Sequence, residues 1–136
     1  MPAGKIILSY LLTAVVFFAI DIIWLGFIGK GIYEKHLGHL LRADINWFAA
    51  IFFYFLFIVG IFVFVIMPAV HHGSLWSAMY MGGLFGLFTY ATYDLTNLAT
   101  LKGWSTTIVF IDIIWGMVLT SVVSMSGFAI VKWLQS

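Results

Sequence analysis

The chain has 136 residues, of which 64% are hydrophobic and 8% are charged. Soluble domains average about 25% charged residues, so this composition, with a mean hydropathy of +1.14, excludes a soluble enzyme and a disordered chain. A net charge of +1 and zero cysteines leave no basic surface for nucleic acid, no disulfides and no thiolate chemistry. We expect a single membrane domain over residues 1–136.

Four continuous apolar runs are long enough to cross a bilayer. They cover about residues 6–29, 47–70, 75–99 and 107–131, and a bilayer core about 30 Å thick needs about 20 residues of helix. Lipid offers no partner to unpaired backbone groups, so each run must be helical. Continuous apolarity does not fit the alternating strands of a barrel. The sequence therefore predicts an all-α membrane protein with four transmembrane helices and the lipid bilayer as its surroundings.

Residues 30–46, between the first two runs, have apolar side chains at helical spacing with charged side chains on the remaining face. This pattern predicts a short interfacial helix lying on the membrane. His36 and His39 lie three residues apart on it and could hold a divalent cation together with Asp94 and Asp112. The alternative is a pair of ordinary histidines among the lipid headgroups. No other cofactor is predicted.

The distribution of basic residues predicts the orientation in the membrane. Loops 30–46 and 100–106 hold four of the six Lys and Arg residues, and the ends of the chain hold Lys5 and Lys132. By the positive-inside rule, both loops are cytoplasmic and both termini lie outside.

Asp21, Asp94 and Asp112 lie inside the apolar runs, where each carboxylate costs about 2.5–3.5 kcal/mol. At 1.5 Å per residue, Asp21 lies about 5 Å from the middle of its run toward the first loop. The other two lie about 10 Å from the middle toward the third loop. All three are therefore expected in the cytoplasmic half of the bilayer. With no Lys or Arg inside any run, either protons or a bound cation compensate them, or they are neutral groups that lock the bundle by hydrogen bonds.

The neighbours of Asp94 suggest a shared site for protons, a cation or a substrate. Tyr90, Asp94 and Asn97 fall on one helical face, and Tyr93 and Thr96 add hydroxyl groups around the same turns. Membrane helices normally turn such polar faces toward other helices or a water-filled cavity.

The pentapeptide Ile-Asp-Ile-Ile-Trp occurs at residues 20–24 and again at 111–115. It indicates either an internal repeat of the kind found in transporters or a local packing solution used twice. A simple inverted repeat would put the second aspartate in the opposite leaflet, which disagrees with the depths above. In each copy the Asp and Trp share a helical face, so Trp24 and Trp115 could cover a carboxyl or donate to it.

The stretch Tyr-Asp-Leu-Thr-Asn-Leu-Ala-Thr at residues 93–100, together with the two Asp-Ile-Ile-Trp motifs, resembles a bacterial family of small multi-pass integral membrane proteins of unknown function. The resemblance spans nearly the whole chain. It implies a location in the bacterial cytoplasmic (inner) membrane and assigns no activity and no residue role.

Three functions stay open at this point, and whether the protein is an enzyme is open with them. The first is a proton-coupled carrier or a pathway for ions or small molecules, acting as a homo-oligomer because four helices barely enclose a cavity. The second is a membrane-embedded enzyme, or enzyme subunit, that acts on a lipid or isoprenoid. The third is a structural or assembly subunit of a small membrane complex without chemistry of its own.

Overall fold

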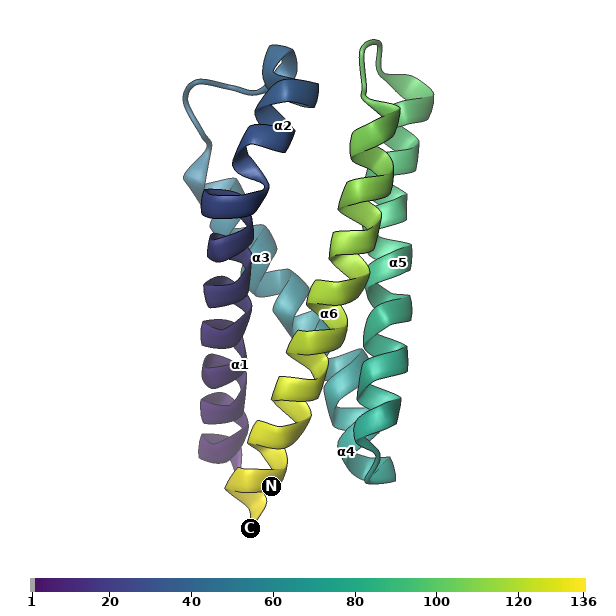
Figure 1. The fold of residues 1–136 in the computed structure, drawn as a ribbon. Helices are drawn as coiled ribbons and strands as arrows, with labels where there is room; N and C mark the ends of the chain where they lie inside the picture. Colours follow the sequence, from purple (N-terminus) through teal and green to yellow (C-terminus); the bar gives the residue numbers. More distant parts are fainter. Residues whose placement is uncertain (1) are drawn as a thin grey trace.

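A computed structural model describes residues 2–136 (Figure 1), and every regular element in that part of the chain is helical. The elements are α1 (Ala3–Ile23), the π-helical turn η1 (Trp24–Ile28), α2 (Lys30–Leu37), the 3-10 turn η2 (Gly38–Leu40), α3 (Trp47–Ile61), the π-helical turn η3 (Phe62–Ile66), α4 (Met67–His72), α5 (Leu75–Thr100) and α6 (Thr106–Gln135). The segments α1–η1, α3–η3–α4, α5 and α6 run alternately up and down. Both termini lie at one end, and α2 and the α5–α6 connection lie at the other (Figure 1). The prediction of an all-α fold is confirmed.

The number of apolar spans differs from the prediction. Within the described residues, three helices are long and apolar enough to cross a membrane: Ala3–Ile28, Trp47–His72 and Thr106–Gln135. The predicted run 75–99 does form a helix, α5, of 26 residues. This helix is less apolar than the other three, because its glycines, its hydroxyl-bearing residues and Asp94 lower its average hydropathy. The prediction of four apolar spans was wrong for this helix, although its length and helical structure were predicted correctly.

The connection at residues 30–46 is helical only in its first part. After α2 and η2 the backbone is irregular up to Asn46, whose side chain caps α3 by accepting from the Ala49 backbone N–H. In Figure 1, α2 follows on from the end of α1 and leans toward α6. A helix is therefore present where one was predicted, while its position on a membrane surface stays a prediction.

Side-chain caps and one glycine set the remaining helix boundaries. Ser74 and Ser105 accept hydrogen bonds from backbone N–H groups in the first turns of α5 and α6, the usual role of serine at a helix N-terminus. Gly73 ends α4 with a φ of 67°, a left-handed conformation that favours glycine. The chain can therefore reverse between α4 and α5 within two residues.

The most extensive pairing in the molecule joins α5 to α6, and small residues make it close. A methyl group at Gly86 would overlap the carbonyl oxygen of Gly116, and one at Gly82 would lie 2.6 Å from the Ser124 hydroxyl oxygen. Gly116 in turn leaves room for the ring of Tyr90. Such contacts let helix backbones approach closely. They set the register that brings Asp94 opposite Asp112.

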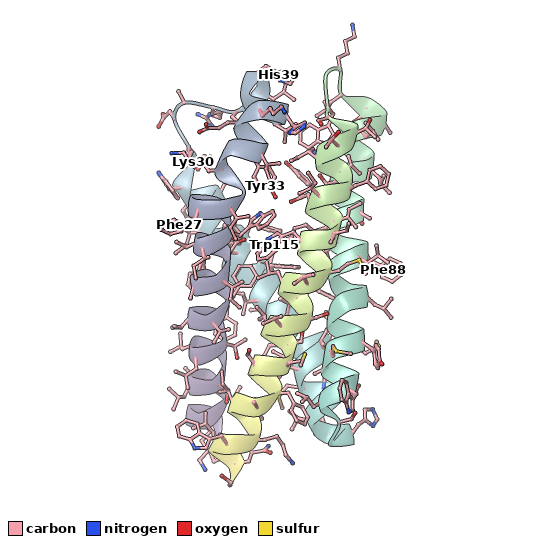
Figure 2. All side chains as sticks on the ribbon, in the orientation of Figure 1. Phe27, Lys30, Tyr33, His39, Phe88 and Trp115 are labelled. Carbon is pink, nitrogen blue, oxygen red and sulfur yellow. The ribbon has the colours of Figure 1, made fainter. Side chains whose placement is uncertain are left out.

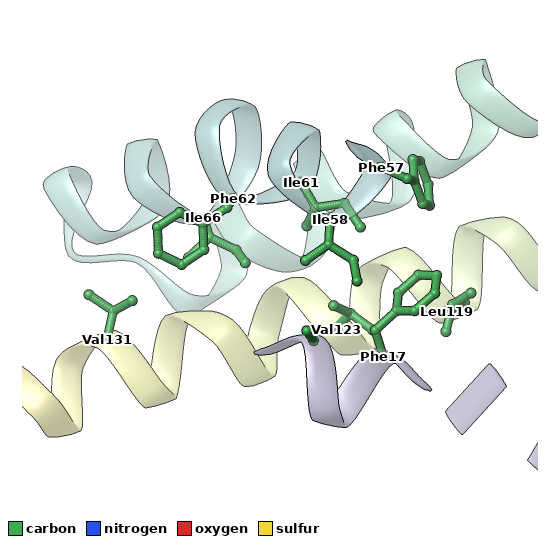
Figure 3. Close-up of a cluster of buried hydrophobic side chains, with 10 residues drawn as sticks. Phe17, Phe57, Ile58, Ile61, Phe62, Ile66, Leu119, Val123 and Val131 are labelled. Carbon is green, nitrogen blue, oxygen red and sulfur yellow. The ribbon is translucent and has the colours of Figure 1, made fainter. Parts of the chain in front are cut away.

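A hydrophobic core holds α1, the α3–η3 rod and α6 together on the terminal side of the aspartates (Figure 3). Its buried side chains are Ala14, Phe17, Phe57, Ile58, Ile61, Phe62, Ile66, Leu119, Val123 and Val131. The remaining space between the helices, toward α2, contains the polar cluster described next.

Candidate functional site

A cavity of about 1150 Å³ lies between α2, α3, α5 and α6. Its polar lining comes from tyrosines, tryptophans, threonines, two aspartates, Lys30 and Glu34, and the rest of its wall is apolar. Figure 2 shows Tyr33 and Trp115 directed into the space between α1–α2 and α6. Phe53 and Phe88 also line the cavity and are 54% and 66% exposed. The cavity therefore reaches the outer surface of the molecule at α3 and α5.

Asp94 of α5 and Asp112 of α6 form a carboxyl pair on the wall of this cavity. The two carboxyls are close enough to interact electrostatically, and only 1% of Asp94 and 9% of Asp112 are exposed. Oδ2 of Asp94 has no hydrogen-bond partner among the described residues. Two carboxyls that lie close together in surroundings of low polarity are unfavourable when both are ionised, so this arrangement favours a proton on one of them.

Tyr33 of α2 connects this pair to the first helix. Its hydroxyl donates to Oδ1 of Asp112 at 2.7 Å and accepts from the indole N–H of Trp24 at 3.1 Å. Burial, followed by the charge of Asp112, raises the pKa of the Tyr33 hydroxyl. The hydroxyl therefore keeps its proton at physiological pH and acts as a donor to the carboxylate.

The two copies of the repeated pentapeptide meet at one level of the antiparallel helices α1 and α6. The indole rings of Trp24 and Trp115 stack with centroids 4.4 Å apart and planes 10° apart. Trp24 reaches Asp112 of the second copy through Tyr33. Trp115 lies near Asp21 of the first copy, but its indole N–H has no hydrogen-bond partner among the described residues. Each tryptophan thus lies close to the aspartate of the other copy, whereas spacing within one helix indicated the aspartate three residues away. This arrangement favours a packing solution used twice.

Asp21 belongs to the cluster but lies behind the cavity wall. It is 6% exposed and is absent from the cavity lining. Its carboxyl interacts with Trp115, with the hydroxyl of Tyr54 on α3, and with Asp112. The structure therefore brings all three predicted aspartates together, with two of them on the cavity surface.

The two tyrosines predicted on α5 lie in different surroundings. Tyr90 is half-buried, lines the cavity and packs edge-on against Phe57, with ring centroids 6.2 Å apart. Tyr93 is exposed, lines the cavity and packs edge-on against Trp104 at 5.7 Å. Both add aromatic surface to the wall beside Asp94.

The other two predicted α5 residues contribute less. Thr96 lines the cavity, but its hydroxyl donates to backbone carbonyls of its own helix, those of Thr92 and Tyr93. Asn97 is half-buried and lies outside the cavity lining. Its backbone carbonyl accepts from the N–H of Leu101, where α5 ends.

His36 and His39 do not join the carboxyls. A ring nitrogen of His36 contacts the carbonyl oxygen of Ile32 at 2.9 Å, and one of His39 contacts that of Gly103, also at 2.9 Å. Within residues 2–136, no three His, Cys, Asp or Glu side chains are arranged to hold a metal ion. A divalent cation stays a prediction to which these two histidines contribute nothing.

Sequence reasoning missed Tyr33 and Tyr54 as members of the site. Tyr54 had a signal, because it is the one hydroxyl-bearing residue in the apolar run 47–70. Tyr33 had none, because its partners Trp24 and Asp112 lie on η1 and α6 and spacing within α2 cannot reveal them.

A family model described as "predicted membrane protein" matches residues 6–129 of the chain. The chain belongs to this family, DUF2177. No curated protein and no solved structure matches it. The matched range of the DUF2177 chain contains the whole cavity lining and all three aspartates. The family resemblance noted on the Tyr-Asp-Leu-Thr-Asn and Asp-Ile-Ile-Trp motifs is thereby confirmed.

Proposed function

We propose that this DUF2177 protein is a small proton-coupled membrane carrier in which the Asp94–Asp112 pair exchanges a proton for cargo in the cavity. One observation carries the proposal: two buried, neighbouring carboxyls, Asp94 and Asp112, lie on the wall of a cavity of about 1150 Å³ that reaches the outer surface. The same groups can then hold a proton in one state and cargo in the other.

The charges around the cavity explain why proton and cargo would alternate. Lys30 is the one basic residue among the described lining residues, and Glu34 lies one helical turn after it on α2. If the carboxyl pair lost its proton, two negative charges would remain in surroundings of low polarity, which is strongly unfavourable. Entry of cargo, or return of a proton, would restore the balance.

We infer that α5 crosses the membrane as a fourth helix, although it is less apolar than the other three. In support, α5 runs alongside α6 (Figure 1), and Gly82, Gly86 and Asp94 on it are buried. By the distribution of basic residues, the cavity end would face the cytoplasm of a bacterial cell and both termini would lie outside the cytoplasmic membrane. In this arrangement α2 would lie at the membrane surface.

A homo-oligomer is part of the proposal. The cavity reaches the surface at Phe53 and Phe88, which one protomer leaves uncovered. A second copy, or lipid, would have to complete the wall there.

The same opening favours a second candidate, a membrane-embedded enzyme that acts on a lipid or isoprenoid. A lipid chain could enter the apolar part of the cavity sideways from the bilayer. In this case the carboxyl pair would act on the headgroup as a general acid and base. In the third candidate, a subunit without chemistry, the carboxyls would serve only to stabilise the packing of α5 against α6.

Flux in proteoliposomes tests the carrier. With an imposed pH gradient, uptake should be measured for a panel of small cations, anions and neutral solutes, for the native chain and for Asp94→Asn and Asp112→Asn. We expect gradient-driven uptake of at least one solute by the native chain and about a tenfold or greater loss in both variants. Asp44→Asn, in the exposed connection before α3, is the matched control and should behave like the native chain.

Full gradient-driven uptake in both cavity variants would contradict the proposal. Conversion of an added lipid extract without any flux, followed by mass spectrometry, would favour the enzyme.

A further inference from the structure

We propose that the cavity binds a primary organic ammonium ion that carries a sizeable apolar group, with its nitrogen at the Asp94–Asp112 pair. The proposal rests on the carrier function above and names its class of cargo. It is carried by the unpartnered oxygen of Asp94, the aromatic wall and the apolar volume of the cavity.

The charges and hydrogen-bonding groups at the pair favour a cationic donor. Oδ2 of Asp94 is an acceptor with no hydrogen-bond partner among the described residues, on a side chain that is 1% exposed. A buried acceptor without a donor is unfavourable. Lys30 and Glu34, at positions i and i+4 of α2, can compensate each other. The carboxyl pair is then left for a ligand N–H group, and an ammonium supplies both the donor and the positive charge.

The wall favours an organic cation over a metal ion. Calcium takes six or more oxygen ligands, whereas the described part of the chain has no group of three or more metal-binding side chains. Around the carboxyl pair the cavity is lined instead by the rings of Tyr33, Tyr54, Tyr93, Trp104 and Trp115. Aromatic faces attract organic ammonium ions.

The size of the cavity calls for more than an ammonium group. Its volume of about 1150 Å³ is slightly above the roughly 300–1,000 Å³ of pockets that hold drug-sized ligands. Apart from the polar cluster, the wall is formed by apolar side chains from η1, α2, α3 and the segment between them, including Leu25, Leu37, Leu41, Ile45, Phe53 and Phe57. An aliphatic or aromatic group on the ligand would fill this part.

Three probes with one skeleton test the class of ligand. Binding of 4-phenylbutylammonium, 4-phenylbutanol and 4-phenylbutyrate to the full chain in detergent should be measured by calorimetry at pH 7.5. We expect the ammonium to bind at least about tenfold more tightly than either of the others and to displace a proton, seen as heat that depends on the ionisation enthalpy of the buffer. Equal binding of the alcohol, or tighter binding of the carboxylate, would overturn the proposal, and neither result depends on a variant folding.

Substitutions locate the site. Asp94→Asn should weaken ammonium binding about tenfold or more and abolish proton displacement, while Asp44→Asn should change neither. Unchanged binding in Asp94→Asn would place the ammonium elsewhere and refute the assignment.

The experiments can contradict the carrier function and the class of cargo independently of each other. Ammonium binding at Asp94 without gradient-driven uptake would remove the carrier and keep the binding site. Gradient-driven uptake of another solute, without ammonium binding, would keep the carrier and remove the cargo class.

Discussion

Tyr33 holds together parts of the site that are far apart in the chain. Its hydroxyl accepts from Trp24 of η1 and donates to Asp112 of α6, so one oxygen atom joins both copies of the repeated motif. Asp112 accepts from Tyr33 at Oδ1 while its carboxyl also lies beside that of Asp94. The state of the carboxyl pair is therefore coupled to the position of α2.

Removing this hydroxyl should destabilise the protein. In Tyr33→Phe, Trp24 loses its acceptor and Asp112 loses its donor, and a buried polar group left unpaired costs about 1–3 kcal/mol. We expect lower thermal stability in detergent, measured by circular dichroism. Tyr80→Phe, at a side chain that is 64% exposed, is the control and should unfold at the native temperature. Native stability in Tyr33→Phe would show that the contact is dispensable.

For single residues, the sequence predicted the depth of the aspartates in the bilayer but not their hydrogen-bond partners. Helical rise put Asp21, Asp94 and Asp112 in one half of the bilayer, and in the structure their carboxyls interact. Hydrogen-bond partners could not be predicted in the same way, because they come from other helices. Tyr54 reaches Asp21 from α3, and this contact depends on how the helices cross.

At the scale of elements, the α5–α6 hairpin is the rigid half of the site. Its glycines fix the distance between the two backbones, and this distance brings Asp94 and Asp112 into contact. Small residues such as Gly82, Gly83 and Gly86 allow a helix to approach a neighbour closely. They do not identify α6 as that neighbour, because a small-residue motif specifies the closeness of an approach and not its partner.

Filling this interface should separate the carboxyls. The new methyl group in Gly86→Ala would overlap the backbone of Gly116, and overpacking of this kind costs about 1–3 kcal/mol. We expect reduced thermal stability together with weaker ammonium binding. Gly4→Ala is the matched control, because nothing lies within 4 Å of the added group, and replacing a helical glycine by alanine gains up to about 1 kcal/mol. Equal stability of the two variants would contradict the packing argument.

The α2 segment forms the other half of the site and is held by fewer contacts than the α5–α6 hairpin. It follows the π-helical turn η1 and Gly29, and besides its packing it is tied to the α5–α6 hairpin by Tyr33 with Asp112 and, through η2, by His39 with Gly103. Apolar spacing predicted its helix but not its direction, because a helical period carries no information about the angle to the preceding helix. Nothing in residues 24–28 marks a π-helical turn in advance.

Adding a side chain at Gly29, the residue before α2, should disturb the site. A methyl group at Gly29 would lie 2.9 Å from both Nε1 of Trp24 and Cε2 of Tyr33. In Gly29→Ala these rings must move apart, so we expect weaker ammonium binding with the α5–α6 pair intact. Gly31→Ala, on the same helix with nothing within 4 Å, should bind like the native chain. Calorimetry on both variants makes the comparison, and equal affinity would rule out a positioning role for Gly29.

At the scale of the whole molecule, the surface is suited to lipid. Large apolar side chains point outward, among them Phe27, Phe48 and Trp133 with 83%, 81% and 68% exposure, and Figure 2 shows Phe27 directed away from the bundle. Composition predicted a membrane protein, and the family description agrees with that prediction. Composition alone does not decide whether α5 spans the membrane. A helix that contacts a polar cavity on one side need not be apolar all round.

The crosswise pairing of the two Asp-Ile-Ile-Trp copies has a consequence for biosynthesis. Helix α1 is made first, and its Asp21 is synthesised long before Trp115 of α6 emerges from the ribosome. The first helix is therefore made before any of the partners of Asp21 exist. Tyr54 follows with α3 and Trp115 comes only with α6, so the surroundings of Asp21 are complete only when the last helix is in place.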